Sequence, residues 1–448
     1  MSHAPAHPLS SRRAEGLSGT VLVPGDKSIS HRSLMLGAVS VGETAISGLL
    51  ESADVHATAR AMAAFGARVE RHQDGTWTVR GLGTGGLVSP SVDIDFGNAG
   101  TGVRLCIGLA STCPVRARFT GDASLCKRPM GRITTPLEQF GAQFDATEGG
   151  RLPLTLTGAS GAMPFTYTLP VASAQVKSAI LLGALNCAGT TTVIEPVATR
   201  DHTERMLRAF GARIDVEAQD SGTAISLHGH AELTGQPVTV PADPSSAAFP
   251  IVAALITEGS DISLPNVMMN ETRTGLLEVL RKMGADIQII STIDTGGETL
   301  AELRVRSSKL RGIEVPPELA PSMIDEFPVL AAAAACAEGE THMSGLEELR
   351  VKESDRLAAV VDGLERNGVQ VSSGEDWMTV TGAGSGAPAG GGTVETHMDH
   401  RIAMAFLVLG MASDKPVTVD DGEIIGTSFP DFEGLMNGCG AQIAQAGT

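Results

Sequence analysis

A short pattern recurs six times along the chain, and this repetition constrains the fold more than any other feature of the sequence. In each copy an amphipathic stretch is followed by a glycine and then by alternating apolar and polar residues. The copies are FGARVE (Gly66), FGAQFD (Gly141), FGARID (Gly211), MGADIQ (Gly284), NGVQV (Gly368) and CGAQI (Gly440). A glycine in this place is typical of a helix end that needs a positive φ, and the alternation predicts a strand. We therefore predict six similar units of roughly seventy residues.

A second series of segments keeps the same register. Six strongly apolar stretches, each opened by polar residues, begin at Asp26, Asn98, Ser173, Asp243, Ile324 and Asp399. A helix that is apolar all round is buried, whereas an amphipathic helix covers a surface. Each unit is thus predicted to hold one buried helix and one outer helix.

The two halves of the chain also resemble each other, because Val23-Pro24-Gly25-Asp26 is matched by Val240-Pro241-Ala242-Asp243. We predict an α/β protein of two similar lobes, each with three units, and crossings near these two proline segments. Residues 24–240 form the first predicted lobe. Residues 17–23 together with 241–448 form the second, and residues 1–16 are predicted to be a loose, flexible tail.

Composition excludes several classes of protein. The formal net charge of −18 argues against a nucleic-acid-coating protein, which needs a basic surface. The six cysteines show no C-x-x-C spacing, so we predict free thiols rather than a disulfide framework or a zinc site. The longest apolar run, over 327–337, is too short to span a bilayer. These features favour a cytoplasmic globular protein that is not a membrane protein.

The openings of the predicted buried helices favour anion binding. They are rich in Ser, Thr, Asn, Lys and Arg, and helix N-termini attract anions through their unpaired N–H groups. In the first opening, Lys27 lies at the helix start, Ser28 is the predicted cap, and Arg32 follows on the same face. If both lobes direct such openings at one cleft, the substrate is predicted to carry phosphate or carboxylates. The plainer alternative is a capped helix with basic surface residues.

Further motifs can also be interpreted either as parts of an anion-binding site or as ordinary capping and surface residues. Asn98–Gly102 is typical of a loop that a ligand approaches closely, and 126–132 holds three basic residues that could equally form a solvated surface. Of the adjacent Asp325 and Glu326, only one is expected to point into a site. The segment from Lys352 to Arg356 could be an ordinary salt-bridged helix start. Arg401, beside an apolar helix, needs an anionic partner.

Seven motifs in order resemble the 5-enolpyruvylshikimate-3-phosphate synthase family, and in particular its second bacterial class. They are DKSISHR, NAGTGVRL, KRPMGR, SAQVKSA, DPSSAAF, LRVKESDR and DHRIAM, and the resemblance spans the chain from about Leu17 onward. It implies two lobes, each of three βαβαββ units around buried parallel helices. It also implies transfer of the enolpyruvyl group of phosphoenolpyruvate to the 5-hydroxyl of shikimate 3-phosphate, with release of phosphate, in aromatic amino-acid biosynthesis. No metal or organic cofactor is implied, and we expect a monomer without nucleic-acid or membrane partners.

The resemblance also implies roles for individual residues. The implied phosphoenolpyruvate site consists of Lys27, Gly100, Arg128, Gln175, Arg356 and Arg401. The implied shikimate 3-phosphate site consists of Lys27, Ser28, Arg32, Ser173, Ala174, Gln175, Arg200, Asp325 and Lys352. Asp325 resembles the base that accepts the 5-hydroxyl proton, and Glu353 the acid that protonates the methylene carbon, with Lys27 as its rival.

Two details bear on phosphoenolpyruvate. Many relatives carry a lysine where this chain has Thr427, so one phosphate contact is expected to differ. In this family glyphosate competes with phosphoenolpyruvate and is crowded by an alanine at the position of Gly100. The glycine here therefore predicts sensitivity to glyphosate.

Three alternatives stay open at this point. A UDP-N-acetylglucosamine enolpyruvyl transferase resembles the same fold but carries a reactive cysteine where this chain has Ala123, and Cys126 is out of register. An RNA 3′-phosphate cyclase is disfavoured by the net charge. A protein that only binds anions would gain nothing from Asp325 and Glu353.

Overall fold

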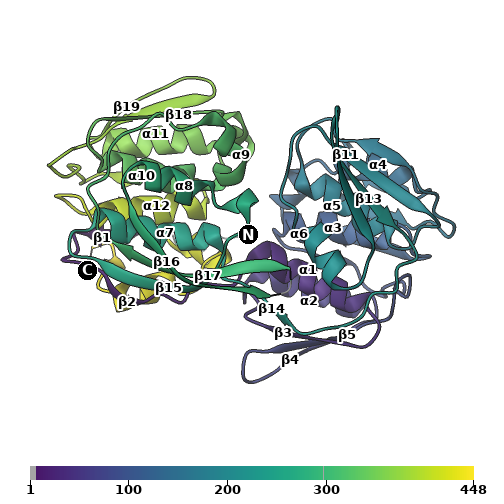
Figure 1. Cartoon of the computed structure of the whole chain (residues 1–448). Helices are drawn as coiled ribbons and strands as arrows, with labels where there is room; N and C mark the ends of the chain where they lie inside the picture. Colours follow the sequence, from purple (N-terminus) through teal and green to yellow (C-terminus); the bar gives the residue numbers. More distant parts are fainter. Residues whose placement is uncertain (1–6, 296, 448) are drawn as a thin grey trace. The chain divides into compact units, whose positions relative to one another are not determined.

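The computed structural model describes residues 7–295 and 297–447, which fall into two compact units. Unit 1 consists of Met1–Pro24, Ala242–Asp294 and Thr299–Thr448, and unit 2 consists of Gly25–Pro241 and Thr295–Glu298 (Figure 1). The chain passes from one unit to the other next to Pro24 and Pro241, the two proline segments that echo each other in sequence.

Unit 2 contains six helices and three four-stranded sheets in its described part. The helices are α1 (Lys27–Ala38), α2 (Ala53–Ala64), α3 (Gly100–Ala110), α4 (Gly131–Glu138), α5 (Ala174–Ala184) and α6 (His202–Ala209). The first sheet has the order β14 (Val238–Thr239), β3 (Glu43–Ser47), β5 (Trp77–Arg80), β4 (Arg68–Arg71). The second is β6 (Ile94–Asp95), β7 (Arg116–Thr120), β9 (Arg151–Thr157), β8 (Gln143–Thr147), and the third is β10 (Thr166–Thr168), β11 (Thr190–Glu195), β13 (Gly222–His228), β12 (Ile214–Gln219).

Unit 1 repeats this plan. Its helices are α7 (Pro244–Ile256), α8 (Gly275–Lys282), the short α9 (Ala320–Met323), α10 (Phe327–Ala335), α11 (Arg356–Arg366), α12 (His400–Gly410) and α13 (Phe432–Gly438). One sheet has the order β16 (Asp286–Thr295), β17 (Glu298–Arg306), β15 (Asp261–Met268), β2 (Ser18–Thr20). The others are β18 (Glu340–Ser344), β20 (Trp377–Thr381), β19 (Gln370–Ser373), and β21 (Thr393–Val394), β22 (Val417–Val419), β1 (Leu9–Arg12), β23 (Gln442–Gln445).

The six repeated glycines have the predicted backbone conformation. Their φ angles lie between +72° at Gly368 and +111° at Gly440, the left-handed region that side chains disfavour. Each follows one of the helices α2, α4, α6, α8, α11 and α13 and precedes one of the strands β4, β8, β12, β16, β19 and β23. The predicted sixfold alternation of helix, glycine and strand is therefore confirmed.

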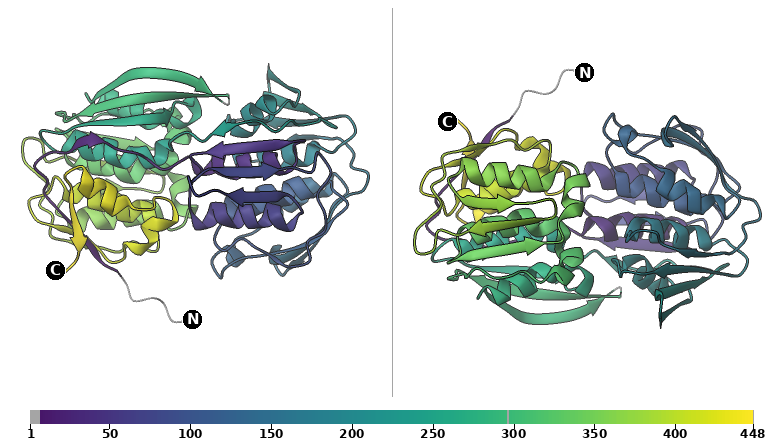
Figure 2. Two further views of the ribbon diagram at one scale, coloured as in Figure 1. Left: turned by 90° about the horizontal axis from the view of Figure 1, so that it is seen from below. Right: turned by 90° about the horizontal axis from the view of Figure 1, so that it is seen from above.

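The apolar helices form the interior of each unit. In unit 1, α10 packs against both α7 and α12, and every residue of α10 is buried. In unit 2, α3 packs against α5 so closely that a Cβ on Gly108 would lie 2.4 Å from the carbonyl oxygen of Ala179. The sheets and amphipathic helices surround these cores, as Figures 1 and 2 show for β3, β4 and β5 beside α1 and α2.

The structure corrects two details. Residues 9–12 of the predicted flexible tail form β1, an inner strand that pairs antiparallel with both β22 and β23. The rest of that predicted tail includes residues 1–6, which lie outside the described residues. The predicted cap Ser28 is also wrong, because Asp26 accepts the hydrogen bond from the backbone N–H of Ile29, and α1 begins at Lys27, two residues earlier than a Ser28 cap implies. Among the described helices, none combines the length and the apolarity that crossing a membrane requires.

Candidate active site

The start of α1 carries two of the predicted binding residues of unit 2. Lys27, its first residue, forms an ion pair with Asp54 at the start of α2. Arg32 lies one turn further along and is almost fully buried. Its Nη1 donates to the backbone carbonyl of Ser28, so Ser28 contributes its carbonyl oxygen to this contact. Lys27 thus pairs with a carboxylate, whereas Arg32 donates to this backbone carbonyl and to two hydroxyl groups that are described below.

A second group of residues lies at the start of α3. We call it the Arg104 cluster, and it consists of Gly100, Arg104, Arg128 and Gln175. Arg104 Nη1 donates to Gln175 Oε1 at 2.9 Å, and Gln175 Nε2 donates to the hydroxyl of Thr101 at 3.0 Å. A Cβ on Gly100 would lie 2.9 Å from Arg128 Nη1 and 3.2 Å from Arg104 Nη1. The glycine therefore lets two guanidinium groups approach one helix N-terminus, an arrangement suited to an anion.

The charge of this cluster affects Arg104 itself. Burial, and then the charges of Arg132 and Arg128, lower the pKa of Arg104 to about 9. A bound anion would relieve this repulsion, because opposite charges nearby favour the charged form of the side chain. The Arg104 cluster is therefore electrostatically prepared for a ligand of negative charge.

The opening of α5 supplies the next predicted residues. Ser173 caps the helix, because its hydroxyl accepts the backbone N–H of Val176 at 3.4 Å. Ala174 is the first helical residue and Gln175 belongs to the Arg104 cluster. Arg200 is partly buried and lies two residues before α6. These residues lie at the start of α5 and just before the start of α6.

Unit 1 brings its predicted residues together around one buried cation. The side chain of Arg356 is 1% exposed, and each of its nitrogens contacts a different carboxylate. Nη1 donates to Asp325 at 3.0 Å, Nε donates to Asp399 at 2.8 Å, and Nη2 donates to Glu353. We call Asp325, Glu353, Arg356 and Asp399 the Arg356 cluster. Its three negative charges meet one buried positive charge, so it can take up further cations or a proton.

Two more predicted residues lie beside this cluster. Lys352 Nζ is 3.5 Å from Asp325 and 2.8 Å from the exposed Glu348. Arg401, the second residue of α12, donates to the backbone carbonyl of Asp325 at 3.1 Å and lies 3.4 Å from Glu326. Asp325 and Glu326 therefore both face basic groups, whereas the sequence suggested that only one of the pair would point into a site.

The Arg356 cluster sets the protonation of Glu353. Desolvation raises its pKa, but the charges of Arg356 and His400 outweigh that effect and lower the pKa of Glu353 to about 2. Burial and the charge of Arg401 lower the pKa of His400 to about 4. Without ligands Glu353 is thus an ionised carboxylate. It becomes a proton donor only when another anion shares the charge of Arg356.

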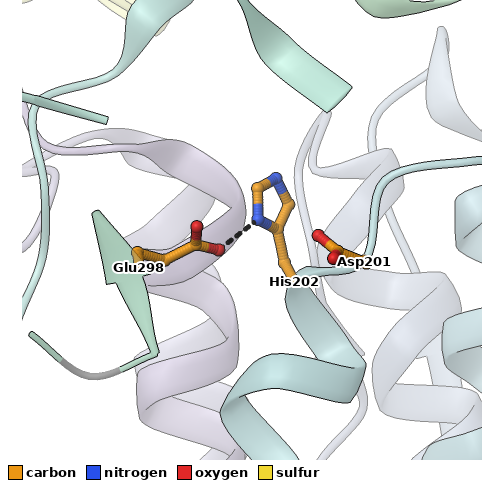
Figure 3. Close-up of side chains that lie close together, drawn as sticks. All are labelled: Asp201, His202 and Glu298. Atoms are coloured by element: carbon orange, nitrogen blue, oxygen red, sulfur yellow. Dashed lines mark hydrogen bonds and ion pairs between the residues drawn. The ribbon is translucent and has the colours of Figure 1, made fainter. Parts of the chain in front are cut away.

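A third group in unit 2 has the composition of a metal site. Asp201, His202 and Glu298 offer ligand atoms within 4.8 Å of one another, and Figure 3 shows the His202 ring beside both carboxylates. His202 Nδ1 lies 2.9 Å from Glu298 Oε1. Arg205 already provides positive charge here, because its Nε donates to Asp201 at 2.6 Å and its Nη1 lies 4.0 Å from Glu298. We therefore assign no metal to this group.

Three residues of these clusters were missed as site residues by the sequence analysis. Arg104 had a usable signal, since an arginine inside an apolar helix needs an anionic or polar partner. Asp399 was noted only as part of the DHR motif, yet it is fully buried against Arg356. Asp54, the partner of Lys27, had no signal, because the sequence does not show that the starts of α1 and α2 adjoin.

Thr427 stands apart from these groups in its contacts. Its hydroxyl donates to the backbone carbonyl of Ile424 within the short 3₁₀ helix Glu423–Thr427. This contact is local, between residues three apart in the same turn.

The fold of two units with three repeats each is shared with solved structures. The enolpyruvyl transferase NikO from Streptomyces tendae superimposes with a TM-score of 0.74 at 19% identity, over 98% of this chain and 99% of that chain, which shows a common fold. EPSP synthase from Acinetobacter baumannii superimposes with a TM-score of 0.90 at 44% identity, over 98% of this chain and 100% of that one. The predicted two-lobe α/β fold class is thereby confirmed.

Sequence comparison identifies the family. The family model described as EPSP synthase (3-phosphoshikimate 1-carboxyvinyltransferase) matches residues 12–436. The 3-phosphoshikimate 1-carboxyvinyltransferase of Chelativorans sp. is 59% identical over 443 residues, covering 98% of both chains. That of Brucella canis is 58% identical over 449 residues, covering both chains fully. The chain belongs to the EPSP synthase family.

Proposed function

We propose that this chain transfers the enolpyruvyl group of phosphoenolpyruvate to the 5-hydroxyl of shikimate 3-phosphate and releases phosphate, as a step of aromatic amino-acid biosynthesis. Membership of the family supports the reaction. The Arg356 cluster is the observation that carries the assignment of residues. One buried cation there contacts both carboxylates, Asp325 and Glu353, that the reaction requires for proton transfer.

The reaction needs a base and an acid in its first half. Asp325 takes the proton of the 5-hydroxyl while the oxygen bonds to the central carbon of phosphoenolpyruvate, and Glu353 gives a proton to the methylene carbon. In the second half the bond from that carbon to the phosphate oxygen breaks, and the leaving phosphate carries away the proton taken from the 5-hydroxyl. The donor, ionised after the first half, takes a proton back from the new methyl group. Lys27 is the alternative donor, since its ammonium is a hydrogen-bond donor held at the start of α1.

The cations hold the two substrates. We assign phosphoenolpyruvate to Lys27, Gly100, Arg128, Gln175, Arg356 and Arg401, with Arg104 added from the structure. We assign shikimate 3-phosphate to Lys27, Ser28, Arg32, Ser173, Ala174, Gln175, Arg200, Asp325 and Lys352. Guanidinium groups stabilise the charge that develops on the leaving phosphate.

Binding of phosphoenolpyruvate prepares Glu353 for its role. An anion at Arg356 shares the charge that lowers the pKa of Glu353, so this pKa rises and the carboxyl group becomes able to carry a proton. The acid is thus available only when the substrate is bound. This coupling explains how a carboxylate with a pKa of about 2 can act as a proton donor.

We also propose that the protein is a monomer and that it works in the cytoplasm. One chain carries residues assigned to both substrates, so we propose a monomer, which sedimentation of the purified protein would test. All six cysteines are free, which suits a reducing compartment.

Phosphate release with phosphoenolpyruvate tests the proposal, with shikimate 3-phosphate compared against a UDP-amino sugar as acceptor. We expect turnover only with shikimate 3-phosphate. Asp325→Asn and Glu353→Gln should each lower kcat by roughly 10²- to 10⁴-fold. The matched control is Glu348→Gln, an exposed carboxylate that also pairs with Lys352 and should leave kcat unchanged. Turnover of the UDP-amino sugar, or full activity of Asp325→Asn, would contradict the proposal.

A further inference from the structure

Arg32 is held by a set of buried oxygens that the reaction itself does not use. Its Nε donates to the hydroxyl of Thr203 at 2.7 Å and its Nη2 to the hydroxyl of Ser178 at 2.9 Å. Both hydroxyl-bearing residues are 1% exposed. We propose that Ser178 and Thr203 are positioning residues that orient the guanidinium of Arg32 toward shikimate 3-phosphate. This inference rests on the proposed function, in which Arg32 binds that substrate.

The donors and acceptors of this group fit together. The hydroxyls of Ser178 and Thr203 lie 2.7 Å apart, so one donates to the other while each accepts from Arg32. A hydroxyl has one donor and two acceptor positions, which this arrangement uses without conflict. Together with the Ser28 carbonyl, these oxygens direct all three nitrogens of the guanidinium. The plane of the Arg32 guanidinium group is therefore fixed by these hydrogen bonds.

The choice of neutral acceptors has an electrostatic consequence. In the Arg356 cluster each nitrogen of the guanidinium donates to a carboxylate, which offsets its charge. The Ser28, Ser178 and Thr203 oxygens orient Arg32 but carry no negative charge to offset it. These three contacts fix the direction of the guanidinium, so little reorganisation is needed when a phosphate group binds.

A buried ion group holds the two hydroxyls in place. Ser178 and Lys177 are neighbours on α5, while Thr203 and Glu204 are neighbours on α6. Lys177 Nζ contacts Glu204 at 2.6 Å and Glu195 at 2.8 Å, and all three side chains are buried. Consecutive residues of α5 thus pair with consecutive residues of α6. The pairing fixes the starts of both helices, and with them the hydroxyls that contact Arg32.

The same group reaches the residue before Arg200. The second oxygen of Glu195 accepts the hydroxyl of Thr199, and Arg200 follows directly. The polar layer between α5 and α6 therefore underlies both cations, Arg32 and Arg200, that we assign to shikimate 3-phosphate. A layer with a purely structural role would not be expected to affect one substrate more than the other.

Steady-state kinetics of Thr203→Val and Ser178→Ala test the inference. Each variant removes a hydroxyl that orients Arg32 and keeps most of the volume. We expect the KM for shikimate 3-phosphate to rise about tenfold, with kcat and the KM for phosphoenolpyruvate within about twofold of the parent. Thr203→Ser keeps the hydroxyl and should restore the parent KM.

Thr112→Val is the matched control. Thr112 is another buried threonine of unit 2, and its hydroxyl donates to the backbone carbonyl of Gly183 at 2.8 Å, away from Arg32. Its loss should leave both KM values unchanged. If Thr203→Val is poorly folded, Ser178→Ala gives the decisive measurement. Equal rises in both KM values, or no rise in either variant, would overturn the inference.

Arg32→Ala separates this inference from the proposed function. If it leaves the KM for shikimate 3-phosphate unchanged, the assignment of Arg32 to that substrate is wrong, and the inference falls with it. If it raises this KM while Thr203→Val and Ser178→Ala do not, the substrate assignment stands and the positioning role alone is refuted.

Discussion

Replacing Lys177 by methionine should destabilise the protein severely, because it removes the only positive charge in the Lys177–Glu195–Glu204 contacts. Lys177 is 1% exposed and contacts both carboxylates within 3 Å. Methionine keeps a long, unbranched side chain at this position but leaves the two acidic groups buried together without a cation. Breaking a buried pair in this way costs about 3–5 kcal/mol. For a unit of about 220 residues this corresponds to a fall of roughly 6–20 °C in the melting temperature.

The pH dependence identifies the cause. Burial already raises the pKa of Glu204 in the parent protein, and loss of Lys177 removes the charge that opposes this shift. A carboxyl group whose pKa is raised on folding binds its proton more tightly in the folded state, so it favours folding at low pH. The deficit of Lys177→Met should therefore shrink as the pH falls from about 8 to about 5.

Calorimetry and urea unfolding at both pH values provide the assay. Adding Glu204→Gln to Lys177→Met should recover part of the stability, since only one buried carboxylate then remains. Lys282→Met is the control, because Lys282 forms an exposed i,i+4 pair with Glu278 and should change stability by less than about 0.5 kcal/mol. An unchanged melting temperature, or a deficit equal at both pH values, would refute the reasoning.

Three further predictions concern the site. Gly100→Ala should raise the KM for phosphoenolpyruvate and weaken inhibition by glyphosate, because the new methyl group would lie 2.9 Å from Arg128 Nη1. If the parent and the variant have the same inhibition constant for glyphosate, this prediction is contradicted. Glu353→Gln should leave the acidic limb of the pH profile of kcat/KM unchanged between about pH 4 and 6. A pKa of about 2 keeps the Glu353 carboxylate ionised in the free protein over this range. A shift of that limb in the variant would contradict this assignment. Arg356→Gln should lower the free energy of unfolding of unit 1 by about 3 kcal/mol, because the fully buried Asp399 loses its cation. An unchanged urea midpoint of unfolding would rule this prediction out.

Much of the fold could be predicted because it repeats. The glycines after α2, α4, α6, α8, α11 and α13 need positive φ angles, and a glycine at that point marks a helix end whatever surrounds it. The strand β1 could not be predicted in this way. Its four residues, Leu9–Arg12, become a strand because β22 and β23 flank it, and those strands lie some 400 residues away in sequence.

The six units, the buried and outer helices, and the basic residues that open the apolar segments could all be predicted without coordinates. These follow from local periodicity and from the backbone needs of single residues. The partner of each charged side chain, in contrast, becomes known only from the packing of the folded chain. The hydroxyls at Arg32, the carboxylate at Lys27 and the three acids around Arg356 come from segments remote in sequence. Whether a cation is oriented, neutralised or prepared for a ligand depends on those contacts, because electrostatic energy depends on distance and burial rather than on order along the chain.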